Sequence, residues 1–355
     1  MDRKSITRRE FMRNSALTAA GTAIGLGLAQ SAGAEEPQAK ILNYNENMEY
    51  RRLGKTGLML SAVVQGGHWK RLIAGSGWDR ADSGMEELDK NREEVLSHCI
   101  DVGINYVDAC SGGEILTYAK ALRGRRDKMY LGFSWYEREP RFPEWRTAAK
   151  LMSGFDQGLK EASLEYVDVW RFSAMMGGEN TDADVEAMVQ AFEKAHQQGK
   201  ARFLGVSSHD RDWLKRVIEK WPQFSVVLTP YTANSKEKPT DSLFDSVRKQ
   251  NVGLLGIKPF SSGSLFRDGA GAGGRQSDGD DELARLAIRY ILSNDAITAP
   301  MAGLISIHQV DNIARAVRER RELDRKEAAV LKHAVEEAHA SLPPDYEWLR
   351  KWDWV

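Results

Sequence analysis

Short apolar runs alternate with longer amphipathic segments along most of the chain. In segment 182–198, for example, Val185, Met188, Val189 and Phe192 recur at helical spacing. A short continuous apolar run is typical of a buried strand, whereas recurrence every three or four residues indicates a helix with one apolar face. The pattern predicts eight strands, at 62–65, 105–108, 129–133, 167–172, 203–207, 225–229, 252–257 and 297–300.

Eight strands that alternate with helices indicate an α/β protein built as a single (β/α)8 TIM barrel. We assign residues 49–320 to this barrel and residues 35–48 to a linker. A C-terminal helical tail follows at 321–355, with a helix at 324–340 and a terminal segment that carries three tryptophans. This segment is expected to pack on the barrel or to form one wall of a substrate pocket, since buried aromatic side chains suit either role.

The N-terminus has the pattern of a twin-arginine signal peptide over residues 1–34. Two arginines follow Thr7, a weakly apolar stretch covers 16–29, and Ala32-Gly-Ala34 provides a cleavage site. This apolar stretch is shorter than the roughly 20 residues that a membrane-spanning helix needs, so we expect no stable membrane insertion. We therefore expect the twin-arginine translocase to carry the protein to the periplasm or another extracytoplasmic space.

Composition limits the possible partners and the role of the cysteines. The 355 residues are 42% hydrophobic, which is enough for one large core, and the formal net charge of -1 excludes a basic surface for nucleic acid. Cys99 falls in a predicted helix and Cys110 directly follows a predicted strand. We expect one buried thiol and one thiol at the site rather than a disulfide, which demands a specific geometry. A small-molecule ligand or substrate is the expected partner.

Four segments occur in the order and spacing of a known family. They are Glu49-Tyr-Arg-Arg-Leu-Gly-Lys-Thr-Gly-Leu58, Gly103-Ile-Asn-Tyr-Val-Asp-Ala109, Gly199-Lys-Ala-Arg-Phe-Leu-Gly-Val-Ser207 and Gly256-Ile-Lys-Pro-Phe260. From Tyr50 to Val317 the chain resembles the aldo-keto reductases. The resemblance implies an N-terminal hairpin before the first barrel strand, and NADP(H)-dependent reduction of a carbonyl group.

The resemblance also implies a catalytic set of tyrosine, lysine, aspartate and histidine, of which the chain matches one member. Asp108 stands at the aspartate position, but the loop that carries the tyrosine is shortened to 110–113. Tyr118 lies inside the next helix pattern, where we expect it to pack. Ser134 and Ser173 occupy the lysine and histidine positions, and a serine supplies neither charge nor acid near neutral pH. The sequence therefore predicts an atypical active site.

The cofactor positions implied by the resemblance are partly retained. The candidate cofactor-binding residues are Ser207, Ser208, Gly303, Gln309 and Asn312. Ser208 replaces the family's asparagine beside the nicotinamide amide. Ile305 stands where the family usually has a polar residue that contacts the ribose phosphate. These two replacements, at Ser208 and Ile305, predict weakened NADP(H) binding.

Polar and aromatic residues cluster at the predicted C-terminal ends of the strands, where TIM barrels place their active sites. Asp108, Lys258 and His68 are the candidate catalytic residues. The candidate substrate-pocket residues are Trp69, Cys110, Ser134, Trp135, Tyr136, Arg171, Ser173, His209 and Tyr231.

Three functions remain open from the residues alone. The first is an oxidoreductase in which Lys258 or His68 replaces the lost groups and Tyr136 or Tyr231 supplies the acid. The second is another enzyme, acting on a sugar or polyol, with Asp108 or His68 as its base. The third is a small-molecule-binding protein without catalysis.

The sequence offers two weaker candidates for ligand sites. A metal site from His68, Cys110 and His209 lacks ligand spacing in the sequence, so no metal is assigned. The Gly/Asp-rich segment 268–281 has no P-loop pattern and is expected to be a surface loop.

Overall fold

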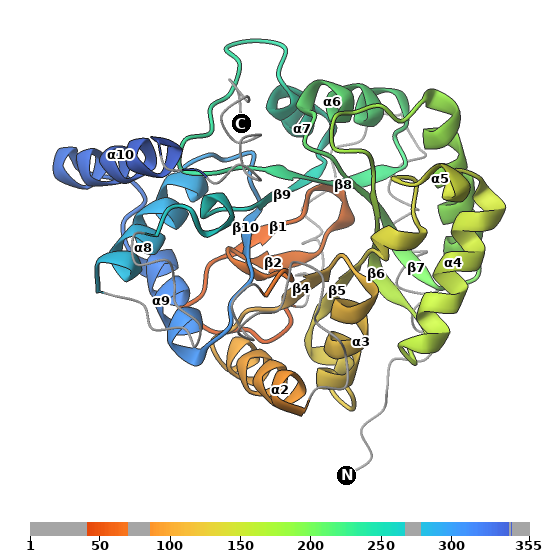
Figure 1. Cartoon of the computed structure of the whole chain (residues 1–355), viewed down its shortest axis with the longest axis horizontal. Coiled ribbons are helices and arrows are strands. Elements are labelled where there is room, and N and C mark those ends of the chain that lie inside the picture. Colours follow the sequence, from red (N-terminus) through yellow and green to blue (C-terminus); the bar gives the residue numbers. More distant parts are fainter. Residues whose placement is uncertain (1–40, 70–85, 267–277, 341, 343–355) are drawn as a thin grey trace, which may run out of the picture.

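A closed barrel of eight parallel strands forms the centre of the computed structural model (Figure 1), which confirms the predicted fold class. Around the barrel the order is β10-β3-β4-β5-β6-β7-β8-β9, so successive strands are neighbours and the last closes on the first. The strands are β3 (Val64–Gln65), β4 (Tyr106–Ala109), β5 (Tyr130–Phe133), β6 (Val167–Ser173), β7 (Ala201–Ser207), β8 (Phe224–Pro230), β9 (Gly253–Ile257) and β10 (Ala299–Ala302).

Amphipathic helices surround the barrel and cover the outer faces of the strands (Figure 1). Several begin at a side chain that accepts a backbone N–H of the first turn, such as Ser111, Asp210, Ser242 and Ser306. The helices are α2 (Glu86–Asp101), α3 (Gly112–Ala121), α4 (Ala148–Glu161), α5 (Asp182–Gln197), α6 (Arg211–Lys220), α7 (Leu243–Gln250), α8 (Asp278–Leu292), α9 (Ile307–Arg318) and α10 (Arg325–Ala340).

The implied N-terminal hairpin is present and packs into one end of the barrel. Strands β1 (Tyr50–Arg52) and β2 (Met59–Ser61) pair antiparallel. Leu53 and Leu60 belong to the same buried cluster as Tyr106 of β4 and Val169 of β6. The Leu53 side chain lies so close to Gly253 that a side chain on Gly253 would collide with it. The hairpin is therefore packed directly against β9. The opposite end, where the strands finish, stays available for a site.

The structure describes residues 41–69, 86–266, 278–340 and 342. The predicted signal peptide at 1–34, most of the Gly/Asp-rich segment 268–281 and the tryptophan-rich end of the tail lie outside these residues. Within the described part, none of the helices combines the length and apolar character needed to cross a membrane. Both cysteines are free, with Cys99 buried and Cys110 partly exposed, as expected for one core thiol and one site thiol.

The start of α5 allows a test of local stability. Thr181 accepts the backbone N–H of Asp184, and Asp184 accepts that of Thr181 in return. Thr181→Ala removes half of this reciprocal cap, so we expect the free energy of unfolding to fall by about 1 kcal/mol in urea titrations. Thr240→Ala, at an exposed loop position, is the control. Equal stability of the two variants would contradict the prediction.

Candidate active site

A single cavity of about 570 Å³ opens where the barrel strands end, within the size range of small-molecule sites. Its wall includes residues that follow seven of the eight strands. The predicted site residues on this wall are His68, Asp108, Cys110, Tyr136, Arg171, Ser173, Ser207, Ser208, His209, Lys258, Gly303, Gln309 and Asn312. The barrel topology therefore brings most of the predicted residues to one place.

Asp108 on β4 and Arg171 on β6 form a buried ion pair at the base of this cavity. Arg171 Nη2 lies 2.7 Å and Nε 3.1 Å from Asp108 Oδ1, and both side chains are almost fully buried. Burial lowers the pKa of Arg171, but the Asp108 carboxylate raises it, and the net direction is upward. Tyr106 also donates a hydrogen bond of 3.1 Å to Asp108 Oδ2. Both carboxylate oxygens of Asp108 are thus held by hydrogen bonds from Arg171 and Tyr106.

The two serines at the implied lysine and histidine positions belong to a buried hydrogen-bond network. Ser134 Oγ lies 2.9 Å from Ser173 Oγ and donates to Glu139 Oε2 over 2.6 Å. Glu139 also accepts the backbone N–H groups of Ser173 and Trp135. Burial raises the pKa of Glu139. Arg171 donates to Ser173 Oγ over 3.1 Å, which connects this network to Asp108.

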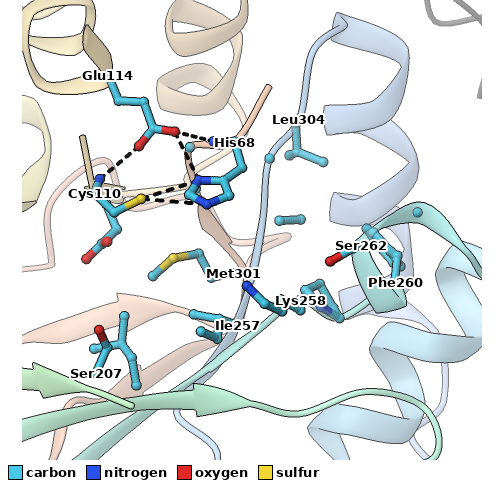
Figure 2. A pocket seen from close by; sticks show the side chains of 18 of the residues that line it. His68, Cys110, Glu114, Ser207, Ile257, Lys258, Phe260, Ser262, Met301 and Leu304 are labelled. Atoms are coloured by element: carbon cyan, nitrogen blue, oxygen red, sulfur yellow. Dashed lines mark hydrogen bonds and ion pairs between the residues drawn. The ribbon is translucent and has the colours of Figure 1, made fainter. Parts of the chain in front are cut away.

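A second cluster joins the loop after β3 to the start of α3 (Figure 2). His68 Nδ1 lies 3.1 Å from Glu114 Oε1 and 3.3 Å from Cys110 Sγ. Glu114 Oε2 accepts the backbone N–H of Cys110 over 2.8 Å. Burial alone would raise the pKa of Glu114, but the adjacent His68 and these hydrogen bonds lower it to about 2. His68 has φ of 57°, a left-handed conformation that is uncommon outside glycine.

Lys258 and Arg141 form a positively charged corner of the same cavity, beside the His209 imidazole. Burial, together with the charges of Arg141 and Arg171, lowers the pKa of Lys258 to about 8. Burial and the charges of Lys258 and Arg141 lower the pKa of His209 to about 2, so its imidazole is neutral near pH 7. Arg141 Nε is buried and has no hydrogen-bond partner among the described residues. This corner therefore suits an anion or an electron-rich oxygen.

The predicted cofactor residues lie along the cavity, but several use their side chains internally. Ser207 Oγ accepts from Arg171 over 3.0 Å, and Ser208 Oγ donates to the carbonyl of Met175 over 2.9 Å. Gln309 Oε1 accepts the N–H of Ile305, and Asn312 Nδ2 donates to the Asp281 carbonyl. Ser306 caps α9 beside these residues, so the N-terminus of that helix lies next to the cavity wall.

Four predicted pocket residues lie outside the wall of this cavity. Ser134 is fully buried in the Glu139 network. Trp69 is buried against Tyr118 with ring centroids 5.0 Å apart. Trp135 and Tyr231 are also buried, Trp135 beneath Arg138 and Tyr231 against Phe244. The positions of all four residues at strand ends indicated exposure to the cavity. The large rings of Trp69, Trp135 and Tyr231 pack between the barrel and the helices instead.

Tyr118 packs as the sequence pattern predicted. Its hydroxyl donates to the carbonyl of Gly66 over 2.5 Å and accepts from Gln65 Nε2 over 2.9 Å. Burial raises its pKa, and it is absent from the described cavity wall. This side chain therefore belongs to the packed core and not to the cavity wall.

The sequence analysis missed three charged residues of the site: Glu114, Glu139 and Arg141. Glu114 and Arg141 line the cavity, and Glu139 lies directly beneath it. Glu114 stands four residues after Cys110 at the start of a helix, a spacing that could have suggested contact. Glu139 and Arg141 follow the end of β5 in an irregular segment, where no periodic pattern indicates which side chains turn inward.

Comparison with known proteins places this site in a family. The model of the Aldo/keto reductase family matches residues 77–278. The chain is 23% identical over 297 residues to L-galactose dehydrogenase of Arabidopsis thaliana, covering 77% of this chain and 89% of the relative. It is 25% identical over 234 residues to L-glyceraldehyde 3-phosphate reductase of Escherichia coli K12, covering 61% and 63% of the two chains.

Solved structures agree on the fold. The holo form of an aldo-keto reductase from Bacillus halodurans superposes with a TM-score of 0.57 at 20% identity, over 81% of this chain and 96% of the other. Because the family model spans more than half of the chain and the barrel carries its site at the expected end, this protein belongs to the aldo/keto reductase family.

Proposed function

We propose that this chain is an exported, nicotinamide-dependent oxidoreductase that reduces the carbonyl group of a small sugar-like molecule. The family assignment supports oxidoreductase chemistry. The two relatives described above carry the name of a sugar or sugar phosphate substrate, which supports a small polyhydroxylated substrate. The twin-arginine pattern at 1–34 supports export.

The observation that carries this proposal is the continuity of the cavity. One space runs from Asp108 and Ser173 at the barrel centre to Gln309 and Asn312 at α9. The family resemblance implies that the first end holds the reacting groups and that the second end holds the adenosine part of the cofactor. The cavity can therefore hold a cofactor and a small substrate side by side. The substrate would lie at the polar end, beside Asp108 and Ser173.

The residues present fit a cofactor that carries phosphate groups. Arg141 Nε is a buried donor without a described acceptor, and Arg141 lies on the cavity wall. The N-terminus of α9 adds backbone N–H groups and a positive dipole end, which favour anions. Bound reduced nicotinamide would supply a hydride to the carbonyl carbon.

We assign Lys258 the role of proton donor to the carbonyl oxygen. Its ammonium group lines the cavity close enough to Arg171 for that positive charge to lower its pKa. A pKa of about 8 is near the ideal for a general acid at neutral pH. The Asp108–Arg171 pair holds Ser207 and Ser173 in place by hydrogen bonds from Arg171. Hydride addition and proton transfer together yield the alcohol and neutral Lys258.

Titration with NADPH and NADH, followed by tryptophan fluorescence and thermal shift, tests the cofactor proposal. We expect micromolar binding of at least one cofactor. Arg141→Met should weaken this binding about tenfold, the effect of losing one charge-assisted hydrogen bond of roughly 1.5 kcal/mol. Arg123→Met, at an exposed position far from the cavity wall, should leave it unchanged. Absence of binding up to millimolar concentration would overturn the proposal and favour a binding protein for another ligand.

A further inference from the structure

We propose that His68, Cys110 and Glu114 form a binding site for a divalent transition-metal ion, with Zn²⁺ as the best match. This site does not depend on the proposed reductase function. The three residues offer one nitrogen, one sulfur and one oxygen ligand, and these atoms all lie within 4.8 Å of one another. Thiolate, imidazole and carboxylate are the three side-chain ligands that Zn²⁺ uses in proteins.

Two of the three distances between the ligand atoms are close to those around a tetrahedral ion. With zinc–sulfur bonds near 2.3 Å and zinc–nitrogen bonds near 2.0 Å, sulfur and nitrogen would be about 3.5 Å apart, and nitrogen and oxygen about 3.3 Å. Cys110 Sγ lies 3.3 Å from His68 Nδ1, and Glu114 Oε1 lies 3.1 Å from the same nitrogen. These two pairs of ligand atoms therefore need to move by only a few tenths of an ångström, and the third pair, the Cys110 sulfur and the Glu114 carboxylate oxygen, lies within 4.8 Å.

The backbone holds the ligands in this arrangement before any ion binds. Glu114 accepts one N–H from Cys110 and one from His68. Each carboxylate oxygen has a second lone pair, so these bonds orient the carboxylate and still leave it able to bind a metal. The left-handed conformation of His68 turns its ring back toward Cys110 (Figure 2). Strained backbone of this kind is found at functional sites more often than elsewhere.

The proposed ion would keep an open coordination position toward the cavity. All three ligands line the cavity wall, and 42% of the His68 side chain is exposed. Three protein ligands with a fourth position for water or substrate are typical of catalytic zinc, whereas structural zinc has four protein ligands. An oxygen of a small ligand in this cavity could therefore bind to the ion directly.

Metal binding to the full-length, freshly reduced protein tests the proposal. Isothermal titration with Zn²⁺ should give one ion per chain with a micromolar or lower dissociation constant. Co²⁺ as a spectroscopic substitute should add the near-ultraviolet sulfur-to-cobalt charge-transfer band. Cys110→Ser should abolish this band and weaken Zn²⁺ binding more than about 100-fold, beyond the effect of altering an outer-shell residue.

Cys99→Ala is the matched control, because Cys99 is the buried thiol of α2 and lies outside the cluster. This variant should keep both the stoichiometry and the cobalt band. Thermal unfolding of each metal-free variant establishes that it is folded, and His68→Gln provides a second ligand variant if Cys110→Ser does not fold. Zn²⁺ binding that survives unchanged in the folded ligand variants, or no binding up to millimolar Zn²⁺, would overturn the proposal.

Discussion

Lys258→Met is expected to lower the turnover rate for carbonyl reduction about 100- to 10,000-fold, the range that general acid catalysis contributes. Methionine keeps most of the length and the apolar stem of lysine but has no proton to donate. The substrate panel consists of small sugar aldehydes, and protein treated with EDTA excludes any contribution from a metal ion. Single-turnover rates and the dissociation constant of NADPH should be measured separately, because only the rate should change by this factor.

The same lysine predicts how the rate depends on pH. Burial lowers the pKa of Lys258 to about 8, and the protonated form is the active one. The rate should therefore be highest below pH 8 and fall about tenfold for each pH unit above it. Lys258→Met should lack this alkaline decline. If the variant kept the wild-type rate and the same decline, the proton would come from another group.

Stability measurements separate loss of catalysis from loss of folding in this variant. The pKa of Lys258 is lower in the folded than in the unfolded state, so keeping this lysine protonated at pH 7 reduces the free energy of unfolding. Stability should therefore rise with pH between about 8 and the ordinary lysine value of 10.5, and Lys258→Met should remove this rise. The variant is expected to be at least as stable as the wild type at pH 7. Lys249→Met, on the exposed side of α7, should change neither activity nor stability.

Asp108→Asn is expected to lower the free energy of unfolding by about 3–5 kcal/mol, the usual cost of leaving one buried charge without its partner. Asparagine has nearly the same shape as aspartate, so the loss reports the charge rather than a cavity. Arg171 would remain buried with its guanidinium uncompensated. Urea-induced unfolding, monitored by tryptophan fluorescence, measures this difference.

A double-mutant cycle shows whether the effect belongs to the ion pair. The double variant Arg171→Met with Asp108→Asn should lose clearly less free energy of unfolding than the sum of the two single variants. The reason is that each single variant leaves one buried charge unpaired, whereas the double variant leaves none. Asp156→Asn breaks the partly exposed pair with Lys200 and should cost no more than about 1 kcal/mol. Additive losses in the Asp108 and Arg171 cycle would mean that the two charges do not interact as the structure shows.

The architecture could be predicted from the sequence because it follows from local periodicity. The apolar run that predicts a strand at 167–172 becomes β6 (Val167–Ser173), and the helical spacing in 182–198 becomes α5. The ends of the strands in the structure differ from the predicted ends by at most two residues. For example, β3 begins at Val64, whereas the predicted strand begins at 62. Since the ends of parallel strands meet at one face of a barrel, the location of the site followed from the same pattern.

The contacts within the site could not be predicted in this way. Asp108 and Arg171 are 63 residues apart, and His68 and Glu114 are 46 apart, so no local spacing indicates either pair. Strand positions alone also misplaced Trp135 and Tyr231, because whether a large ring fills the core or the cavity depends on the volumes of its neighbours.

The sequence by itself determined the barrel and its hairpin, and it predicts an atypical active site without the family's tyrosine, lysine and histidine. These properties depend on residue identity and on patterns that each segment carries alone. Only the tertiary structure decided that Asp108 is neutralised by Arg171, that Lys258 is buried enough to lower its pKa, and that Glu114 joins His68 and Cys110. Burial and charge pairing arise when distant segments pack together, and they set the chemistry of each group.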